Sequence, residues 1–327
     1  MSAGSPAANR FNVVMTAPRL AAQAVAVLEA AGCAIHYTPP YPGSAIVAEI
    51  AGRVRADAIL ARQGQIDAAA IAASPRLRVI ARHGVGVDEV DLAAAAAHGV
   101  MVTRAPGSNT QAVAEHALAM MLALVKDLKP FATLVAAGGW RGATGHCRDV
   151  AGLRIGLIGC GAIGAAVARM AAAFGMTTAA FDPAIPPGGL PGIAKANCLL
   201  VLAAGSDILS VHCPLTETTR GLVGAAVLAA MPAGGFVVNT ARGGILDEAS
   251  LLAALDSGHL AGAALDVFAE EPPPPGHPLR AHPRVLVTPH VAGVTPGSLV
   301  TMGVMAAECI AAVLTGGRVP PERIVVA

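Results

Sequence analysis

The sequence predicts an α/β protein with two parallel sheets. Short apolar runs alternate with alanine-rich stretches that can form helices, which is the rhythm of βαβ units. The alternation occurs twice, first in the N-terminal third of the chain and again from Leu153 onward. Because the chain has 327 residues, of which 54% are hydrophobic, it has room for two domains with a core each.

The first alternating series predicts five strands and four helices. The strands are expected at residues 12–16, 34–37, 58–60, 78–82 and 100–103, and the helices at 19–31, 45–51, 66–73 and 91–98. Ala105-Pro106-Gly107 then interrupts the pattern. Ser108 followed by Gln111 resembles a capping box, so we expect a long helix from there to the region of Lys126.

The second series predicts another parallel sheet. Its strands are expected at residues 153–158, 177–181, 208–212, 235–238, 262–265 and 285–287, with a helix at 162–174. Pro296-Gly297 turns the chain into a last helix that runs to the region of Leu314, too late to belong to that sheet. We expect this helix to return to the first domain. Residues 1–105 and 295–327 would then form one domain, and residues 106–294 the other.

Composition argues against several classes of protein. A net charge of +1 gives no electrostatic basis for binding nucleic acid or an anionic membrane. Residues 155–181 and 221–241 are apolar and long enough to cross a bilayer, but Arg169 and Pro232 interrupt them, and buried parallel strands produce the same hydropathy. The N-terminus lacks a signal-peptide pattern, so we expect a cytoplasmic protein with no membrane partner.

The cysteines and histidines give no sign of a metal site. The six cysteines show neither a CxxC motif nor zinc-like pairing, and the ten histidines include no HExxH motif. We expect reduced thiols in apolar surroundings, which agrees with a cytoplasmic location. We expect no bound metal.

A glycine motif after the first strand of the second series predicts a dinucleotide site. Gly159-Cys160-Gly161-Ala162-Ile163-Gly164 matches G-x-G-x-x-G, follows an apolar strand and opens a predicted helix. Asp182 ends the next strand. In such a unit the glycines let a pyrophosphate approach the helix N-terminus, and the carboxylate binds the adenosine ribose.

Three later strand ends carry the residues for acid/base and carboxylate chemistry. Arg242 follows the strand at 235–238, Glu270 and Glu271 follow the strand at 262–265, and His290 follows the strand at 285–287. An arginine can bind a carboxylate, and a carboxylate beside a histidine raises the histidine pKa. The set suits hydride transfer at a 2-keto or 2-hydroxy acid. Chemistry alone does not separate Glu270 from Glu271.

Other polar residues leave alternatives open. His212 also follows a strand, although its place before Cys213-Pro214 suits a backbone or cofactor-lining role, and position favours His290. His116 lies within an apolar helix and is expected to pack or cap. Asp266 ends its strand directly and could line the cofactor site.

At these residues the chain resembles the D-isomer-specific 2-hydroxyacid dehydrogenase family, in particular its phosphoglycerate dehydrogenase-like group. The resemblance extends over nearly the whole length and rests on motifs in the same order. These are Arg82-His83-Gly84-Val85-Gly86-Val87-Asp88, Ala114-Glu115, the glycine motif, His212-Cys213-Pro214-Leu215-Thr216, Asn239-Thr240-Ala241-Arg242-Gly243-Gly244, Leu265-Asp266-Val267-Phe268 and Pro289-His290.

The resemblance implies a role for each candidate residue. Arg242 matches the substrate-binding arginine, Glu271 the partner of the histidine, and His290 the acid/base. The backbone amides of Val85 and Gly86 match those that bind the substrate carboxylate. NAD is the implied cofactor, and besides Gly159, Gly161 and Gly164 its lining is implied to be Ala162, Ile163, Asp182, Cys213, Thr219, Thr240, Asp266 and Gly293.

The resemblance also implies two Rossmann-like domains. Residues 1–105 and 295–327 would form a flavodoxin-like substrate domain, and residues 106–294 the dinucleotide-binding domain. Two positions depart from the family pattern. Ala162 stands where many relatives have an arginine that contacts pyrophosphate, and Glu89 stands where asparagine is common.

The implied function is NAD-dependent dehydrogenation of a small D-2-hydroxy acid, or reduction of the matching 2-keto acid, by a homodimer. Substrates of the 3-phosphoglycerate, glycerate/hydroxypyruvate or glyoxylate type fit this class. Arg62 and Arg82 could meet a phosphate or a second carboxylate, or could form salt bridges. The alternatives are an NAD(H)-sensing co-repressor on the same fold, a scaffold with a degenerate site, and a formate dehydrogenase, whose relatives have glutamine in place of Glu271.

Overall fold

The computed structural model describes residues 10–140 and 147–327, and the chain divides into two compact units. Unit 1 comprises residues 1–109 and 294–327, and unit 2 comprises residues 110–293. The boundaries lie at 109/110 and 293/294, next to the predicted ones at 105/106 and 294/295. Residues 1–9 of the predicted first domain lie outside the described residues.

Unit 1 contains a six-stranded sheet in the order β13-β5-β4-β3-β1-β2. The order 2-1-3-4-5 of its first five strands is that of flavodoxin-like folds, which confirms the predicted fold class. One feature differs from the prediction, because β13 pairs with β5 antiparallel at the sheet edge. The strands are β1 (Phe11–Met15), β2 (Cys33–Tyr37), β3 (Ala58–Ala61), β4 (Val79–Arg82), β5 (Met101–Thr103) and β13 (Ile324–Val326).

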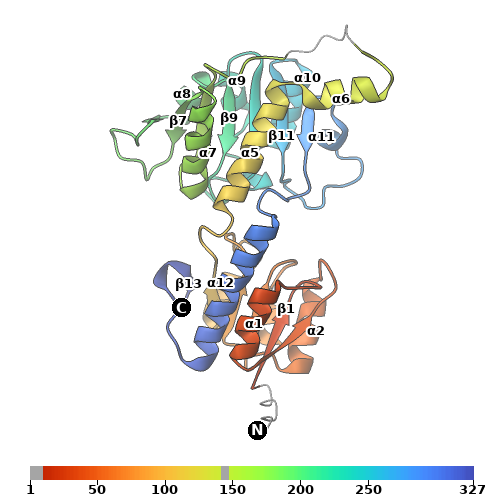
Figure 1. The fold of residues 1–327 in the computed structure, drawn as a ribbon, viewed down its shortest axis with the longest axis vertical. Coiled ribbons are helices and arrows are strands. Elements are labelled where there is room, and N and C mark those ends of the chain that lie inside the picture. Colours follow the sequence, from red (N-terminus) through yellow and green to blue (C-terminus); the bar gives the residue numbers. More distant parts are fainter. Residues whose placement is uncertain (1–9, 141–146) are drawn as a thin grey trace, which may run out of the picture. The chain divides into compact units, whose positions relative to one another are not determined.

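Helices cover both faces of the unit 1 sheet. One face is packed by α1 (Ala22–Ala30) and α12 (Pro296–Thr315), which lie side by side in Figure 1. The other face is packed by α2 (Ser44–Val54), α3 (Ala68–Ala72) and α4 (Leu92–Ala97). By length and composition α12 could cross a membrane, but its apolar side forms part of this core.

Unit 2 contains a seven-stranded parallel sheet in the order β12-β11-β10-β9-β6-β7-β8. Its central strands are buried along their whole length, because both faces are covered, and this explains their continuous apolar sequences. The strands are β6 (Arg154–Ile158), β7 (Thr177–Phe181), β8 (Ile193–Lys195), β9 (Ile208–Val211), β10 (Gly235–Asn239), β11 (Leu260–Leu265) and β12 (Val285–Val287).

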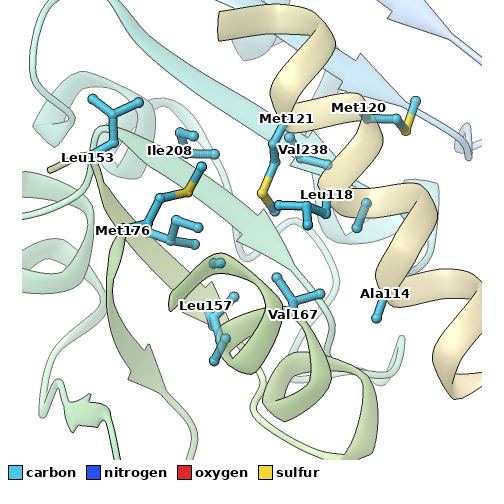
Figure 2. Packing of buried hydrophobic residues seen from close by; sticks show 14 of the residues in the cluster. Ala114, Leu118, Met120, Met121, Leu153, Leu157, Val167, Met176, Ile208 and Val238 are labelled. Atoms are coloured by element: carbon cyan, nitrogen blue, oxygen red, sulfur yellow. The ribbon is translucent and has the colours of Figure 1, made fainter. Parts of the chain in front are cut away.

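One face of the unit 2 sheet is packed by α5 (Thr110–Val125) and α7 (Ala162–Ala173). Figure 2 shows Met121 and Leu118 of α5 beside Val167 of α7 and Val238 of β10. The opposite face is packed by α8 (Leu199–Ala204), α9 (Ala225–Ala230), α10 (Glu248–Asp256) and α11 (Pro278–Ala281). Small alanine side chains let these helices lie close to the strands.

The start of α5 differs from its predicted capping box. The helix begins at Thr110, and the Ser108 hydroxyl donates to the Ala105 carbonyl over 2.6 Å. The Gln111 amide reaches forward to Glu115 over 2.7 Å and not back toward Ser108. The turn at Ala105 therefore uses the serine that was expected to cap the helix.

Helix α6 (Leu128–Ala136) follows α5 and is the most exposed helix of unit 2. None of its residues is buried within the described part of the chain. Leu128 and Val135 on this helix and Trp140 after it are 56%, 52% and 74% exposed. Within the described residues, Leu128 and Val135 therefore form an apolar side of α6 that faces solvent.

Candidate functional site

The glycine loop after β6 lies where the strand order of unit 2 reverses. β6 pairs with β7 on one side and with β9 on the other, and ligands of open α/β sheets bind beyond strand ends at such a reversal. Gly159 has a φ of 88°, and a Cβ there would lie 2.6 Å from the Cys213 nitrogen. A Cβ on Gly164 would lie 2.5 Å from the Gly159 oxygen. Close packing of this loop therefore requires glycine at both positions.

The surroundings of the loop fit a dinucleotide. No side chain caps α7, and within the described residues a Cβ on Gly161 would meet no atom within 4 Å, so the helix N-terminus is open to a phosphate. Asp182 directly follows β7 and accepts hydrogen bonds from the amides of Cys160 and Ala184, over 2.7 and 2.8 Å. The buried Thr240 hydroxyl finds no hydrogen-bond partner in the described chain.

The remaining predicted cofactor residues lie at the same ends of the unit 2 strands. Ala162 and Ile163 form the first turn of α7. Because position 162 is alanine and not arginine, the groups that can donate hydrogen bonds to a phosphate there are backbone amides. Cys213 is half-buried after β9, and burial raises the pKa of its thiol to about 11. The Thr219 hydroxyl donates to a main-chain carbonyl of the turn after β9 over 2.7 Å. Gly293 is the last residue of unit 2.

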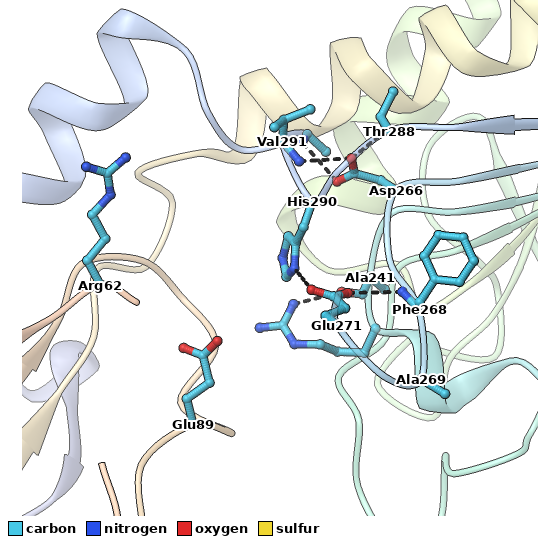
Figure 3. Close-up of polar contacts among 12 residues, drawn as sticks. Arg62, Glu89, Ala241, Asp266, Phe268, Ala269, Glu271, Thr288, His290 and Val291 are labelled. Carbon is cyan, nitrogen blue, oxygen red and sulfur yellow. Dashed lines mark hydrogen bonds and ion pairs between the residues drawn. The ribbon is translucent and has the colours of Figure 1, made fainter. Parts of the chain in front are cut away.

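Asp266 holds the turn that carries the candidate histidine. The residue is 1% exposed, and its carboxylate accepts the Thr288 hydroxyl over 2.5 Å and the amides of Val291 and Ala292 over 2.9 Å each. The amide of His290 donates to the Asp266 carbonyl over 2.8 Å. This buried carboxylate therefore fixes the backbone on both sides of the histidine (Figure 3).

His290 and Glu271 form a direct pair. Nδ1 of His290 lies 2.6 Å from Oε2 of Glu271, and the other carboxylate oxygen accepts the Phe268 amide over 3.0 Å (Figure 3). Their side chains are 45% and 34% exposed, so a small ligand can reach them. The neighbouring Glu270 is exposed to solvent. The geometry thus separates the two glutamates that the sequence left unresolved.

Each member of the pair shifts the pKa of the other, and both shifts favour the charged forms. The hydrogen bond to Glu271, with the charge of that carboxylate, raises the pKa of His290 more than burial and the Arg242 charge lower it. Burial raises the pKa of Glu271, but the hydrogen bond and charge of His290, the Phe268 amide and Arg242 outweigh it, so that pKa is lowered. Both shifts favour an imidazolium beside a carboxylate.

Arg242 follows β10 on a turn that a buried asparagine holds. Asn239 accepts the Ala241 amide over 3.0 Å and donates to the Arg242 carbonyl over 2.9 Å. The guanidinium donates to the Ala241 carbonyl over 2.7 Å, and its positive charge acts on both Glu271 and His290. Unit 2 therefore brings the three predicted catalytic side chains to one site.

The other histidine candidates have structural contacts. Desolvation lowers the pKa of His212 to about 4, and its Nε2 lies 2.8 Å from the Ser210 hydroxyl, so it is neutral at pH 7. His116 on α5 places Nε2 3.0 Å from the Thr288 hydroxyl, next to the Asp266 carboxylate. It supports the end of β12, in agreement with the predicted packing or capping role.

Unit 1 holds Val85 and Gly86 on the loop after β4, and Arg82 fixes that loop. Arg82 donates to the Gly86 carbonyl and to the Arg62 carbonyl over 2.8 Å each, and it forms an ion pair with Glu89. Arg82 thus forms a salt bridge, and Glu89 has a structural role as its partner. The half-buried Arg62 guanidinium makes no hydrogen bond or ion pair with any residue that the structure describes.

Two further polar residues beside the site could not be identified from the sequence. Glu248 at the start of α10 accepts the Ala269 amide over 2.7 Å and lies 3.0 Å from Nε2 of His277. Neither residue follows a strand, and an acidic residue at a helix start has an ordinary explanation in the helix dipole. Within the described residues, no three His, Cys, Asp or Glu side chains gather as metal ligands.

Comparison with known proteins places unit 2 among dinucleotide-binding domains. The sequence profile described as "D-isomer specific 2-hydroxyacid dehydrogenase, NAD binding domain" matches residues 118–292, more than half of the chain. The D-3-phosphoglycerate dehydrogenase of Archaeoglobus fulgidus is 40% identical over 256 residues, which cover 78% of this chain and 49% of that protein. The chain thus spans about half the length of the curated relatives it matches.

Solved structures match nearly the whole chain. The TT0316 protein from Thermus thermophilus is 36% identical with a TM-score of 0.87, and the match covers 97% of this chain and 100% of that one. The NAD-dependent formate dehydrogenase from Staphylococcus aureus, solved with NAD, is 28% identical with a TM-score of 0.86, and the coverages are 97% and 99%. Both units therefore share their fold with these proteins.

Proposed function

The chain belongs to the D-isomer specific 2-hydroxyacid dehydrogenase family, and from this premise we propose that it is an NAD-dependent dehydrogenase of a small 2-hydroxy acid. The observation that carries the proposal is the 2.6 Å contact between His290 and Glu271, with the Arg242 charge acting on both. A proton donor, its carboxylate partner and a cation are what reduction of a 2-keto acid requires.

In the proposed reduction, each site residue has one task. Arg242 binds the substrate carboxylate and polarises the keto oxygen. Nδ1 of His290 faces Glu271, so Nε2 is the nitrogen left to donate a proton to that oxygen. Glu271 keeps the imidazole oriented and protonated. By correspondence with the family, the amides of Val85 and Gly86 also bind the carboxylate.

The cofactor is proposed to be held along unit 2. Backbone amides of Gly161 and Ala162 at the start of α7 would bind the pyrophosphate, Asp182 the adenosine ribose, and Thr240 a further polar group. When bound, NADH supplies the hydride that C2 of the keto acid accepts. Because position 162 has no arginine, the phosphates would be bound by the N-terminus of α7 alone.

The assembly and location are part of the proposal. The exposed apolar face of α6, together with Trp140, supports a homodimer. All six cysteines are free thiols, which supports a reducing, cytoplasmic compartment. A net charge of +1 supports the absence of nucleic-acid or membrane partners.

The substrate class is tested with a panel of 2-keto acids and NADH. Glyoxylate, hydroxypyruvate and its 3-phosphate are measured with wild type and His290→Ala, because relatives include D-3-phosphoglycerate dehydrogenases and the guanidinium of Arg62 could take an anionic group. We expect turnover of at least one acid, and its loss in the variant. NADH binding without turnover of any acid would favour a cofactor sensor.

Formate dehydrogenase is the second candidate, because the similarity to the Staphylococcus aureus enzyme extends over both units. The carboxylate at position 271 argues against it, since an anionic partner stabilises the imidazolium that a keto oxygen needs as donor. The same assay with formate and NAD⁺ separates the two. Formate oxidation that exceeds every keto-acid rate would reverse the assignment.

A further inference from the structure

A second carboxylate–histidine pair lies against the loop that carries Glu271. Glu248 and His277 are separated by a 3.0 Å contact between Oε2 and Nε2, and their side chains are 18% and 19% exposed. Through its other oxygen, Glu248 accepts the Ala269 amide over 2.7 Å. The reaction outlined above leaves this pair without a task.

The peptide between Phe268 and Ala269 links this pair to the site. The Phe268 amide donates to Glu271, and the next amide, that of Ala269, donates to Glu248. A Cβ on Gly243 would lie 1.9 Å from the Phe268 carbonyl carbon, so the turn after Arg242 packs directly on the same peptide. Phe268 therefore joins the two groups, because its carbonyl carbon lies against the turn of Arg242 and its own N–H, in the preceding peptide, donates to the carboxylate that partners His290.

His277 contacts the side chain of Phe268. Its ring lies edge-on to the Phe268 ring, with centroids 5.3 Å apart and an interplanar angle of 82°. The loop is thus held by a hydrogen bond to Glu248 and by an aromatic contact with His277. These two residues also contact each other, over the 3.0 Å between Oε2 of Glu248 and Nε2 of His277.

The role of Glu248 differs from that of an ordinary acidic residue in a first helical turn. Asp247 already caps α10 by accepting the Ala249 amide. Glu248 instead turns toward Ala269, which lies beyond β11, and both of its oxygens are engaged. A backbone amide needs an acceptor, so this hydrogen bond favours the loop conformation in which the Ala269 amide faces Glu248.

We propose that Glu248, held by His277, is a positioning residue that fixes the Phe268–Ala269 peptide and thereby the alignment of Glu271 with His290. The expected effect on the reaction rate rests on the proposed function. The positioning of Glu271 against His290 does not depend on it. Misplacement of a catalytic group by about 1 Å can cost roughly a hundredfold in rate, so a remote anchor of this kind controls activity.

The test compares Glu248→Ala with Glu248→Gln. Alanine removes the acceptor for the Ala269 amide, whereas glutamine keeps an oxygen acceptor and loses only the charge. Asp256→Ala is the matched control, because Asp256 ends the same helix and lies 3.4 Å from Nε2 of another histidine, His282, away from the loop. The readouts are the pKa of His290 from NMR titration, and the pH profile of kcat/KM for the best keto acid.

We expect Glu248→Ala to lower the His290 pKa toward its ordinary value of about 6.5 and to reduce kcat/KM roughly tenfold or more. Glu248→Gln and Asp256→Ala should keep both close to wild type. Glu271→Gln is the positive control and should lower the His290 pKa. If it does so while Glu248→Ala leaves the His290 pKa unchanged, the inference is overturned. Equal pKa shifts in Glu248→Ala and Glu248→Gln also overturn it, because the effect would then be one of charge and not of position.

Two further outcomes are informative. If the His290 pKa falls as expected but wild type reduces no keto acid, the inference stands and the proposed function fails. If Glu248→Ala does not fold, His277→Phe takes its place, since it keeps a ring against Phe268 and removes the partner of Glu248. A His290 pKa lowered in that variant supports the inference, and an unchanged value overturns it.

Discussion

The main-chain amide of His290 donates to the carbonyl of Asp266, while the carboxylate of the same aspartate accepts the two amides that follow the histidine. His290 has a φ of 53°, in the left-handed region that residues other than glycine adopt at a cost of about 1–3 kcal/mol. The hydrogen bonds of Asp266 offset this cost. They turn the imidazole so that Nδ1 meets Glu271 and Nε2 is left for a substrate.

The Glu271–His290 pair predicts a specific pH dependence. Keto-acid reduction needs the imidazolium, so kcat/KM should be constant below the raised pKa of His290 and fall as the pH rises through it. Glu271→Gln removes the charge that raises this pKa, so the fall should begin at a lower pH. The profile is measured from initial rates of NADH oxidation, with the exposed Glu270→Gln as control. A shift in the control and not in Glu271→Gln would identify the wrong glutamate.

Replacement of the arginine should affect substrate and cofactor differently. Arg242→Ala removes a charge-assisted contact to the substrate carboxylate, and we expect kcat/KM to fall by about 10²- to 10³-fold, or roughly 3–4 kcal/mol. NADH affinity, measured by fluorescence titration, should change less than about threefold. Arg318→Ala, an exposed arginine of unit 1, is the control. Activity within about threefold of wild type would exclude Arg242 as the substrate anchor.

Two adjacent glycines give a matched test of packing beneath the site. A Cβ on Gly243 would lie 1.9 Å from the Phe268 carbonyl carbon, whereas the atoms nearest to a Cβ on Gly244 would be side-chain atoms of Arg220 and Leu215, at 3.3 Å or more. Gly243→Ala should therefore lower the free energy of unfolding by at least about 1–3 kcal/mol, and Gly244→Ala by much less. Urea denaturation measures both. Equal losses would show that the Gly243 turn can shift freely.

Asp182 predicts a preference for NADH over NADPH. Its carboxylate lies at the end of β7 where the adenosine ribose is expected, and it would repel a 2′-phosphate there. We expect kcat/KM with NADH to exceed that with NADPH by at least tenfold, and Asp182→Asn to reduce the ratio. Steady-state kinetics with both cofactors measure the ratio. Comparable efficiencies in wild type would contradict this role of Asp182.

The exposed face of α6 predicts self-association. Sedimentation at micromolar concentration should give a dimer of twice the 32.4 kDa chain. Leu128→Asp with Val135→Asp should shift the equilibrium toward monomer, because charges would have to be buried in an apolar interface. Val201→Asp, 65% exposed on α8, is the control. A wild-type monomer would exclude the dimer. A double variant that remains dimeric would show that the interface lies away from α6.

Most of the strands, and the positions of Arg242 and His290 beyond two of them, could be predicted from sequence because their signals are local. Buried parallel strands are continuous apolar runs, and Arg242 and His290 each lie three residues beyond the end of such a run. The short helices α8 and α9 escaped prediction, since they have six residues each and lack a side-chain cap. Strands β8 and β13 escaped it because their three residues each carry no periodicity, and the antiparallel pairing of β13 with β5 depends on tertiary structure.

The supporting contacts of the site could not be predicted for a different reason. Glu248 and His277 meet only because α10 and the segment before α11 pack beside the same loop, and neither sequence position carries a pattern. The choice between Glu270 and Glu271 likewise depends on which side chain the loop turns toward His290. Such pairings are set by the folded backbone, and sequence spacing does not encode them.

The division of unit 1 between two distant segments has a consequence for biosynthesis. Helix α12 supplies Ala306, Ala307, Cys309 and Ile310 to the core beneath α1, so the first 109 residues lack part of their own interior until the ribosome has made the last segment. Unit 2 is continuous in sequence and can acquire its core earlier. One face of the nascent N-terminal sheet is therefore covered by α1 alone until the unit inserted into it has been synthesised.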